Sequence, residues 1–224
     1  MHLGIIMDGN RRWAKKRLLP TIMGHKAGFD TAKNIIEYAG KNKNITHLTL
    51  WALSKENLIK RDAEELAGII KLIEKLQDLL PNMQENNIKF ETIGDIEKLP
   101  VESVEILKKV KQETQNNTGM VLIAALVYSG QDEIVRGIKK VFESGIDLNT
   151  LDEKNFKQFL DTKDFPAPDL IIRTGGDIRH SGFTLYDSAY SEYYFTEELW
   201  PDFDENEFDI ALDFFENCKR NFGK

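Results

Sequence analysis

Short apolar segments alternate with longer helix-like segments along nearly the whole chain. The apolar segments have the length and continuous apolar character of strands that are buried on both faces. Strands that are separated by helices are usually joined in parallel, with helices covering the sheet. The alternation therefore predicts an α/β fold: a single domain with a mainly parallel central β-sheet and helices on both of its faces.

The hydrophobic pattern places the individual elements. We expect strands at 2–7, 47–53, 88–93, 120–128, 169–173 and 193–196. We expect helices at 24–40, 62–86, 101–116, 132–144, 151–160 and 205–222. In the helix at 62–86, Asp62 and Glu65 resemble a capping box, and Pro81 should kink or end it.

Composition supports one soluble domain covering residues 1–224. Apolar residues make up 41% of the chain, which is enough for a large core, and no Gly/Ser/Pro-rich linker divides it. The 30 basic and 37 acidic residues give a net charge of −7. This balance argues against a general nucleic-acid or anionic-membrane binder, although it leaves room for a local basic pocket.

Three further features indicate a cytoplasmic protein. Cys218 is the single cysteine, which excludes an internal disulfide and a cysteine-rich zinc site. The longest wholly apolar run, 120–127, is far shorter than the roughly 20 residues that span a bilayer. The N-terminus leads directly into a strand pattern and does not have the order of a signal peptide.

Polar segments follow three of the predicted strands. The segment DGNRRW (8–13) follows the first strand, SKEN (54–57) the second, and RTGGD with RHS (173–181) the fifth. Ligands of parallel sheets bind beyond the carboxyl ends of the strands, so these segments should meet at one edge. Their arginines, glycines and carboxylates are typical of a metal-assisted phosphate site.

Simpler interpretations exist for several of these residues. Asp8 could be a helix cap, the two glycines after Thr174 could be a turn, and His25 could be a surface residue at a helix start. Arg173 is harder to dismiss, because an unpaired charge at the end of an apolar strand would be costly. The five basic residues within 11–17 are unusual in an acidic protein and favour anion binding.

Familiar phosphate motifs are absent. The chain has no Gly-x4-Gly-Lys-Ser/Thr and no Gly-x-Gly-x-x-Gly. Asn10 stands two places after Asp8, where a phosphoaspartyl phosphatase would want a second aspartate. No Asp-Asp pair occurs, which argues against an all-helical prenyl synthase.

Five segments in order resemble the cis-prenyltransferases, most closely those that make undecaprenyl diphosphate in bacteria. They read IIMDGNRRWAKK (5–16), GHKAG (24–28), LSKEN (53–57), DLIIRTGGDIRHSGF (169–183) and AYSEYYFTEELWPDF (189–203). The resemblance implies a transferase that extends farnesyl diphosphate by successive cis additions of isopentenyl diphosphate. The product would be a long polyprenyl diphosphate, the precursor of a cell-wall lipid carrier, which is handed to the membrane by a cytoplasmic, peripheral enzyme.

The resemblance also implies roles for individual residues. Asp8 would be the metal-linked catalytic aspartate, and Glu192 from the other subunit of a homodimer would complete the Mg²⁺ site. Asn57, with Ser54 nearby, matches the position assigned to proton removal. The allylic diphosphate would bind Gly9, Asn10, Arg11, Arg12 and His25, and isopentenyl diphosphate would bind Arg173, Arg179 and Ser181. Further substrate-binding candidates in the same segments are Trp13, Lys55, Glu56, Lys60 and His180.

The chain departs from the family pattern at three places. Thr21 stands where bacterial members usually have an arginine, and Arg17 could replace it. The segment 58–61 reads LIKR where the family has Trp-x-Arg-Pro, so Lys60 or Arg61 must supply the arginine's charge. The segment 127–131 reads VYSGQ where the family usually has Asn-Tyr-Gly-Gly-Arg.

A hydrocarbon product needs an apolar tunnel between the sheet and the helices. Its candidate walls, most of which would also suit an ordinary core, are Ile6, Leu50, Ala52, Ile69, Ile73, Ile88, Phe90, Met120, Leu122 and Ala124. A dense aromatic cluster at 183–203 surrounds Glu192 and suggests a subunit interface. Two other functions stay open: a non-catalytic subunit that supports a partner, and a Mg²⁺-dependent phosphohydrolase.

Overall fold

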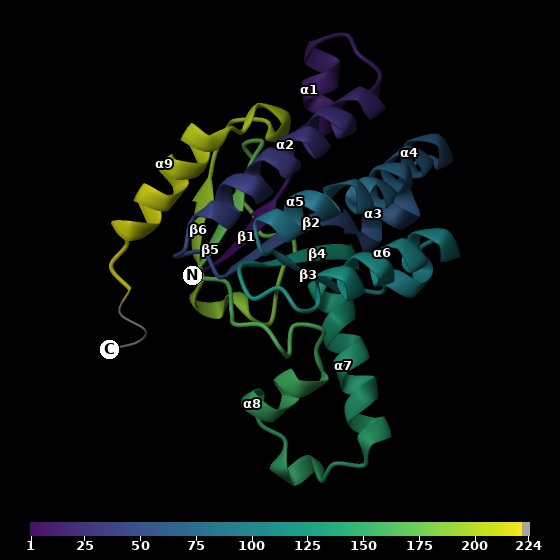
Figure 1. The fold of residues 1–224 in the computed structure, drawn as a ribbon. Helices are drawn as coiled ribbons and strands as arrows, with labels where there is room; N and C mark the ends of the chain where they lie inside the picture. The colour runs from purple at the N-terminus through teal and green to yellow at the C-terminus, as the bar shows by residue number, and fades with distance from the viewer. Residues whose placement is uncertain (221–224) are drawn as a thin grey trace.

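Six parallel strands form one central sheet in the computed structural model, which describes residues 1–220 (Figure 1). Their order across the sheet is β3-β4-β2-β1-β5-β6, and every neighbouring pair is parallel. The strands are β1 (His2–Ile6), β2 (His47–Ser54), β3 (Lys89–Ile93), β4 (Val121–Tyr128), β5 (Leu170–Arg173) and β6 (Glu192–Phe195). The predicted α/β domain with a parallel sheet is confirmed.

The helices connect these strands and close the chain. They are α1 (Asn10–Lys16), α2 (Thr21–Lys41), α3 (Lys55–Lys60), α4 (Ala63–Glu74), α5 (Leu80–Glu85), α6 (Val101–Thr114), α7 (Gly130–Ser144), α8 (Glu153–Phe156) and α9 (Glu205–Glu216). None of the helices within residues 1–220 combines the length and the apolarity needed to cross a membrane.

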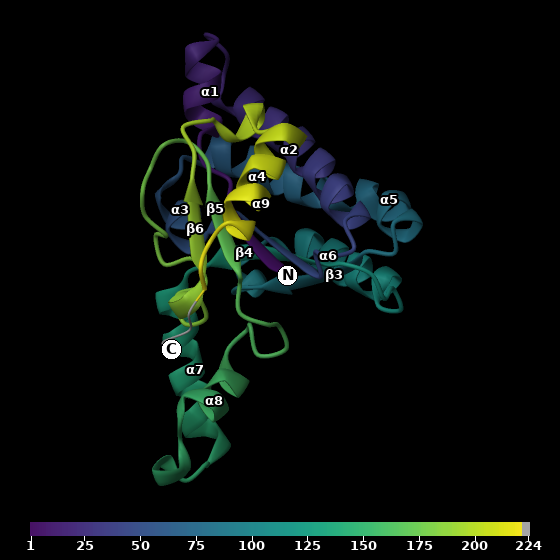
Figure 2. The same ribbon diagram turned by 90° about the vertical axis from the view of Figure 1, so that its left-hand side faces the viewer.

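The two faces of the sheet are covered differently. Leu3 and Ile5 of β1 belong to the larger core, which α2, α4, α6 and α9 cover (Figures 1 and 2). Ile6 belongs to the opposite face, where Phe183 packs so closely that a Cβ on Gly4 would lie 2.8 Å from its ring. We expected helices over both faces, but α7 and α8 extend away from the body, and loop residues cover much of this second face.

Three predicted helices differ from the observed ones. The helix expected at 62–86 is α4, a 3₁₀ segment η1 (Lys75–Leu79) and α5, and Pro81 lies in the first turn of α5, where its missing N–H costs nothing. The helix expected at 151–160 is reduced to α8 and a short 3₁₀ turn. The last helix ends at Glu216, and the end of its predicted range, 221–222, lies outside the described residues.

Candidate functional site

The carboxyl ends of β1 and β5 bring two distant segments together. Ile6 is in register with Arg173, and Asp8 follows two residues later. A carboxylate oxygen of Asp8 accepts a hydrogen bond from Arg173 Nη2 at 2.9 Å. Thr174 Oγ1 accepts the Asp8 N–H at 3.0 Å and donates to the Asp8 carbonyl at 2.7 Å. The last residue of β5 and the residue that follows it therefore hold both the side chain and the backbone of Asp8.

Arg173 organises the loop that follows it. Its side chain is buried, and Nη1 donates to the Arg179 carbonyl at 2.6 Å and to Ser181 Oγ at 2.7 Å. Nη2 also donates to Asp177 at 3.3 Å, so two carboxylates converge on one nitrogen. The Nε atom is buried and has no hydrogen-bond partner among residues 1–220. Arg173 therefore places a fixed positive charge at this end of the sheet, which suits an anionic ligand.

A second arginine flanks Asp8. Arg12 Nη2 lies 3.1 Å from the other carboxylate oxygen of Asp8, and Nη1 donates to the Gly175 carbonyl. Gly175 has a φ of +87°, and a Cβ there would lie 2.6 Å from Arg12 Nη2. This backbone conformation favours glycine, and any side chain there would also displace the Arg12 guanidinium. Asp8 is thus fixed between two guanidinium groups.

A third cationic group gathers around Glu65 in the first turn of α4. Glu65 is only 6% exposed and accepts hydrogen bonds from Arg11 Nε at 3.0 Å and from Arg11 Nη2. His25 Nε2 lies 2.7 Å from the same carboxylate, and Arg61 donates to it as well. Arg61 Nη1 is also 2.9 Å from His25 Nε2, while Arg61 Nε is buried without a partner in the described chain.

These contacts set the protonation states of the cluster. Burial opposes the charge of Glu65, but hydrogen bonds from Arg11 and His25 and the charge of Arg61 outweigh it and lower the Glu65 pKa to about 2. Burial lowers the pKa of His25 more than the Glu65 hydrogen bond raises it. At neutral pH the group therefore holds an ionised Glu65, a neutral His25 and two arginines.

The start of α3 forms another side of the site. Ser54 is the N-cap of α3, and its Oγ accepts the Asn57 N–H at 3.0 Å. Lys55 forms an ion pair with Asp132 of α7, and this pair occupies its ammonium group. Lys60 is exposed at the end of α3.

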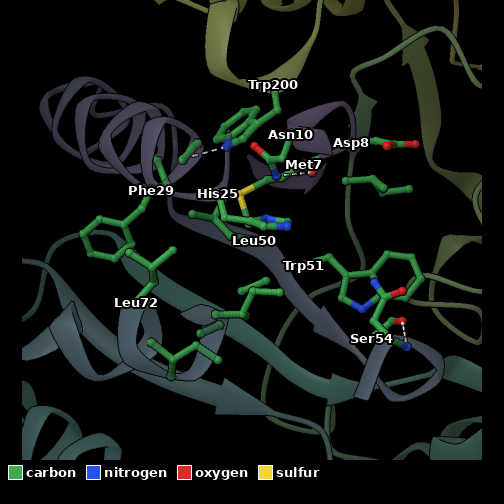
Figure 3. Close-up of a pocket in the computed structure, with 18 of the residues that line it drawn as sticks. Met7, Asp8, Asn10, His25, Phe29, Leu50, Trp51, Ser54, Leu72 and Trp200 are labelled. Atoms are coloured by element: carbon green, nitrogen blue, oxygen red, sulfur yellow. Dashed lines mark hydrogen bonds between the residues drawn. The ribbon is translucent and has the colours of Figure 1, made fainter. Parts of the chain in front are cut away.

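A cavity of about 610 Å³ opens between these groups and continues between the sheet and helices α2 and α4 (Figure 3). Its polar lining includes Asp8, Asn10, Arg11, His25, Ser54, Asn57, Arg61, Arg173 and Ser181. Its apolar lining includes Phe29, Ile36, Leu50, Ile69, Ile73, Leu76, Leu79, Phe90, Leu122 and Ala124. The cavity thus joins a cationic mouth to an apolar interior.

Comparison with known proteins shows which family and which relatives this chain resembles. A family model described as "Putative undecaprenyl diphosphate synthase" matches residues 6–223. The "Isoprenyl transferase" of Clostridium tetani (strain Massachusetts / E88) is 42% identical over 227 residues, covering 99% of this chain and 88% of that protein.

The chain belongs to the undecaprenyl diphosphate synthase family.

Other members extend the comparison. The "Ditrans,polycis-undecaprenyl-diphosphate synthase ((2E,6E)-farnesyl-diphosphate specific)" of Buchnera aphidicola subsp. Schizaphis graminum (strain Sg) is 43% identical, covering 99% of this chain and 90% of that protein. Lavandulyl diphosphate synthase from Lavandula x intermedia, solved with dimethylallyl diphosphate, superposes with a TM-score of 0.95 at 34% identity, covering 100% of this chain and 98% of that one. The resemblance drawn from the five sequence segments is confirmed.

The structure brings only part of the predicted undecaprenyl diphosphate synthase site to the cavity. The predicted residues that line it are Asp8, Asn10, Arg11, His25, Ser54, Glu56, Asn57, Arg173 and Ser181. The predicted residues outside its lining are Gly9, Arg12, Trp13, Lys55, Lys60, Arg179, His180 and Glu192. Of the predicted tunnel walls, Ile88 and Met120 belong to the closed core instead, because their side chains pack near Gly40 of α2.

Glu192 lies far from Asp8 within one chain. It pairs with Leu170 at the start of β5, whereas Arg173 beside Asp8 is at the end of that strand. Three residues of strand rise separate the two positions by about 10 Å. Glu192 and Asp8 therefore do not meet within one chain.

Sequence reasoning missed two residues of the site, Glu65 and Asp177. The sequence predicted that Glu65 completes a capping box with Asp62. Only one of the two hydrogen bonds forms: Asp62 accepts the Glu65 N–H at 2.9 Å, whereas the Glu65 carboxylate binds Arg11. Its place four residues before the buried Ile69 was a usable signal, since a carboxylate on a buried helix face needs partners. Arg17 is also engaged elsewhere, with Asp202 at 3.1 Å.

Proposed function

We propose that the protein is a Mg²⁺-dependent cis-prenyltransferase, which extends farnesyl diphosphate with isopentenyl diphosphate and releases pyrophosphate. The observation that carries this proposal is the cavity itself: two separate arginine groups stand at its mouth, and its interior is apolar. A single phosphate would not need both groups, whereas two diphosphates side by side would. The names of the relatives and the dimethylallyl diphosphate in the lavandulyl diphosphate synthase structure support the same assignment.

The allylic diphosphate is assigned to the Glu65 side of the mouth. Arg11, His25 and Arg61 line this side of the cavity, where Glu65 holds all three side chains in place. The hydrocarbon tail would enter the apolar interior past Phe29 of α2. Guanidinium forks match diphosphate oxygens and carry a charge at every physiological pH.

Isopentenyl diphosphate is assigned to the Arg173 side. Arg173 holds Ser181 and the Arg179 carbonyl in place, so the loop that would receive this diphosphate is preformed. Arg179 is exposed and pairs with Asp177 at 2.7 Å, so this surface ion pair would have to open before Arg179 could contact the diphosphate. The two substrates would then lie on opposite sides of Asp8.

The reaction needs a leaving pyrophosphate and the loss of one proton. The allylic C–O bond breaks, and its electron pair leaves with pyrophosphate. The double bond of isopentenyl diphosphate supplies the electron pair of the new C–C bond, and loss of a proton from the adjacent carbon forms the new double bond. Fixed donors such as Arg11 and Arg61 stabilise the negative charge that develops on the leaving group.

Asn57 is assigned to the path of that proton. It lines the cavity, and its position is fixed by the hydrogen bond from its N–H to Ser54. A neutral amide is a weak base, so Asn57 would orient or relay the proton, which is accepted by Asp8 or by the pyrophosphate.

The Mg²⁺ site is assigned to Asp8, with Glu192 of a second subunit of a homodimer. Within residues 1–220 no three His, Cys, Asp or Glu side chains gather into a metal cage. Mg²⁺ is usually bound through one or two carboxylates together with substrate phosphates, which fits Asp8 beside the diphosphate positions. When bound there, the ion would neutralise charge on the leaving pyrophosphate.

The direct test is product analysis after incubation with farnesyl diphosphate, labelled isopentenyl diphosphate and Mg²⁺. The proposal predicts labelled lipid of defined length, pyrophosphate release only with both substrates, and loss of turnover in folded Asp8→Ala. Phosphate release without isopentenyl diphosphate would indicate a phosphohydrolase. Activity that appears only with an added partner protein would indicate a supporting subunit.

A further inference from the structure

The segment that joins α1 to α2 exposes a cluster of large apolar side chains. Every residue from 15 to 23 is exposed, and this segment carries Leu18, Leu19, Ile22 and Met23. Leu18 is 95% exposed. Both views place this tip at one end of the molecule, opposite the arm formed by α7 and α8 (Figures 1 and 2).

Leu18 is in an energetically unfavourable position in the folded chain. Its φ of +55° is in the left-handed region, which is unfavourable for a leucine and comfortable for glycine. Its side chain is also almost wholly in water, so burial does not compensate for the strain. A strained and exposed leucine next to a second exposed leucine points to a surface that is covered by something else.

The charged residues within this tip and next to it in the sequence are all basic, and one of them, Arg17, is paired with Asp202. Lys15, Lys16 and Arg17 precede it and Lys26 follows, and no acidic residue occurs between 15 and 26. The chain as a whole carries a net charge of −7, which argues against a general attraction to anionic surfaces. Charges act mainly within about 8 Å at physiological salt, so the local cations dominate where the tip touches a surface.

We propose that residues 15–23 dock the protein onto a lipid bilayer that contains anionic lipids. Apolar side chains would enter the boundary between headgroups and acyl chains, and the flanking lysines would contact the phosphates. The tip is a projecting turn with cations beside leucines, which suits insertion into a bilayer.

The position of the tip relative to the cavity supports a bilayer as the partner. Helix α1 carries Lys15 and Lys16 at its end and Arg11, which lines the cavity mouth, about one turn earlier. Docking would therefore bring the mouth close to the lipid headgroups. This last step rests on the proposed function, because a polyprenyl diphosphate has its diphosphate at headgroup level; the lipid binding itself does not rest on it.

Co-sedimentation with vesicles tests the docking surface. Vesicles of phosphatidylcholine with phosphatidylglycerol should bind the protein, and pure phosphatidylcholine vesicles should bind it much more weakly. The double variant Leu18→Gly/Leu19→Ser and the double variant Lys15→Glu/Lys16→Glu should each lower binding by at least about tenfold. Val101→Ser removes a 74% exposed aliphatic side chain from α6 and should bind like the wild type.

Two measurements make these results decisive. Glycine suits the left-handed backbone at position 18, so the Leu18→Gly/Leu19→Ser variant should keep its far-ultraviolet circular dichroism and its melting temperature. Prenyl transfer in detergent should also stay unchanged, which separates failed docking from a failed enzyme assignment. The proposal would be overturned if the wild-type protein did not bind anionic vesicles, or if the Leu18→Gly/Leu19→Ser variant bound them as strongly as the wild type. Loss of a homo-oligomer in the leucine variant would also overturn it, because the tip would then bind a second copy of the chain.

Discussion

Arg11 and Glu65 form a two-point ion pair that joins α1 to α4, with Arg11 Nε 3.0 Å from the carboxylate. The same carboxylate accepts hydrogen bonds from His25 and Arg61. These three side chains are also the donors that we assign to the allylic diphosphate. Glu65 therefore holds the donors in place and, as an anion, competes with the substrate for them.

Replacing Glu65 by glutamine should strengthen diphosphate binding and weaken the fold. Removal of one negative charge at the solvent-accessible mouth should lower the Kd of a non-cleavable farnesyl diphosphate analogue by roughly fivefold, equivalent to about 1 kcal/mol. Loss of charge-assisted hydrogen bonds should lower the free energy of unfolding by roughly 1.5–3 kcal/mol. Titration calorimetry and urea unfolding give the two values.

Asp78→Asn is the matched control for this prediction. It removes one negative charge from an exposed position in η1, outside the cluster, and should change neither value. Weaker analogue binding in Glu65→Gln would contradict the account, because it would show that ordering the donors matters more than competition.

The contribution of Glu65 to stability should depend on pH in a defined direction. Its folded-state pKa of about 2 is below the ordinary value of 4.5, so its stabilisation is fully present above pH 4.5 and is lost as the pH falls through 2. The contribution is at most about 3 kcal/mol, and less because Arg11 is exposed to solvent. Urea unfolding of wild type and Glu65→Gln at pH 7, 5, 4 and 3 should show a gap that narrows below pH 5. A gap that stays constant would contradict this assignment.

Arg61, rather than Lys60, should carry the charge that the family pattern provides at this place. Arg61 lines the cavity and contacts His25, whereas Lys60 is exposed outside it. Arg61→Ala should weaken binding of the allylic analogue by roughly 10- to 100-fold, through loss of a charged donor. Lys60→Ala should change it by less than about threefold. The reverse order in the same calorimetric titration would show that the chain rearranges when substrate binds.

Ala124 should limit how far the product chain can grow. It lies on β4 in the apolar cavity lining, so Ala124→Leu should fill part of the cavity and shorten the principal product by at least one isoprene unit. Ala125→Leu is the matched control, because Ala125 is buried on the opposite face of the same strand. Both changes should destabilise the fold by roughly 1–3 kcal/mol through overpacking. Chromatography of the labelled lipids distinguishes them, and equal shortening by both would contradict the cavity assignment.

The meeting of Asp8 and Arg173 could be predicted from the sequence. Both follow apolar strands, and parallel strands end at the same edge, so the sequence order of strands and polar segments was sufficient. The prediction of a helix at 62–86 was correct for most of that range. Its break into α4, η1 and α5 was not readable, because the apolar spacing continues through the break.

The Glu65 cluster and the cavity walls depended on tertiary packing. Glu65 contacts Arg11 only because the folded chain brings the first turn of α4 to the start of α1, and nothing in the local sequence sets that approach. Periodicity likewise predicts that Ile88 and Met120 are buried. It does not tell a closed core from the wall of a cavity, which depends on how far α2 and α4 stand from the sheet.

The most direct test of the central claim is a crystal structure of the protein with a non-cleavable farnesyl diphosphate analogue, isopentenyl diphosphate and Mg²⁺. The account predicts one diphosphate against Arg11, His25 and Arg61, with its tail in the cavity. It predicts the other diphosphate against Arg173 and Ser181, with Asp8 between the two. Electron density that places either diphosphate away from this mouth, or the farnesyl tail outside the cavity, would contradict it.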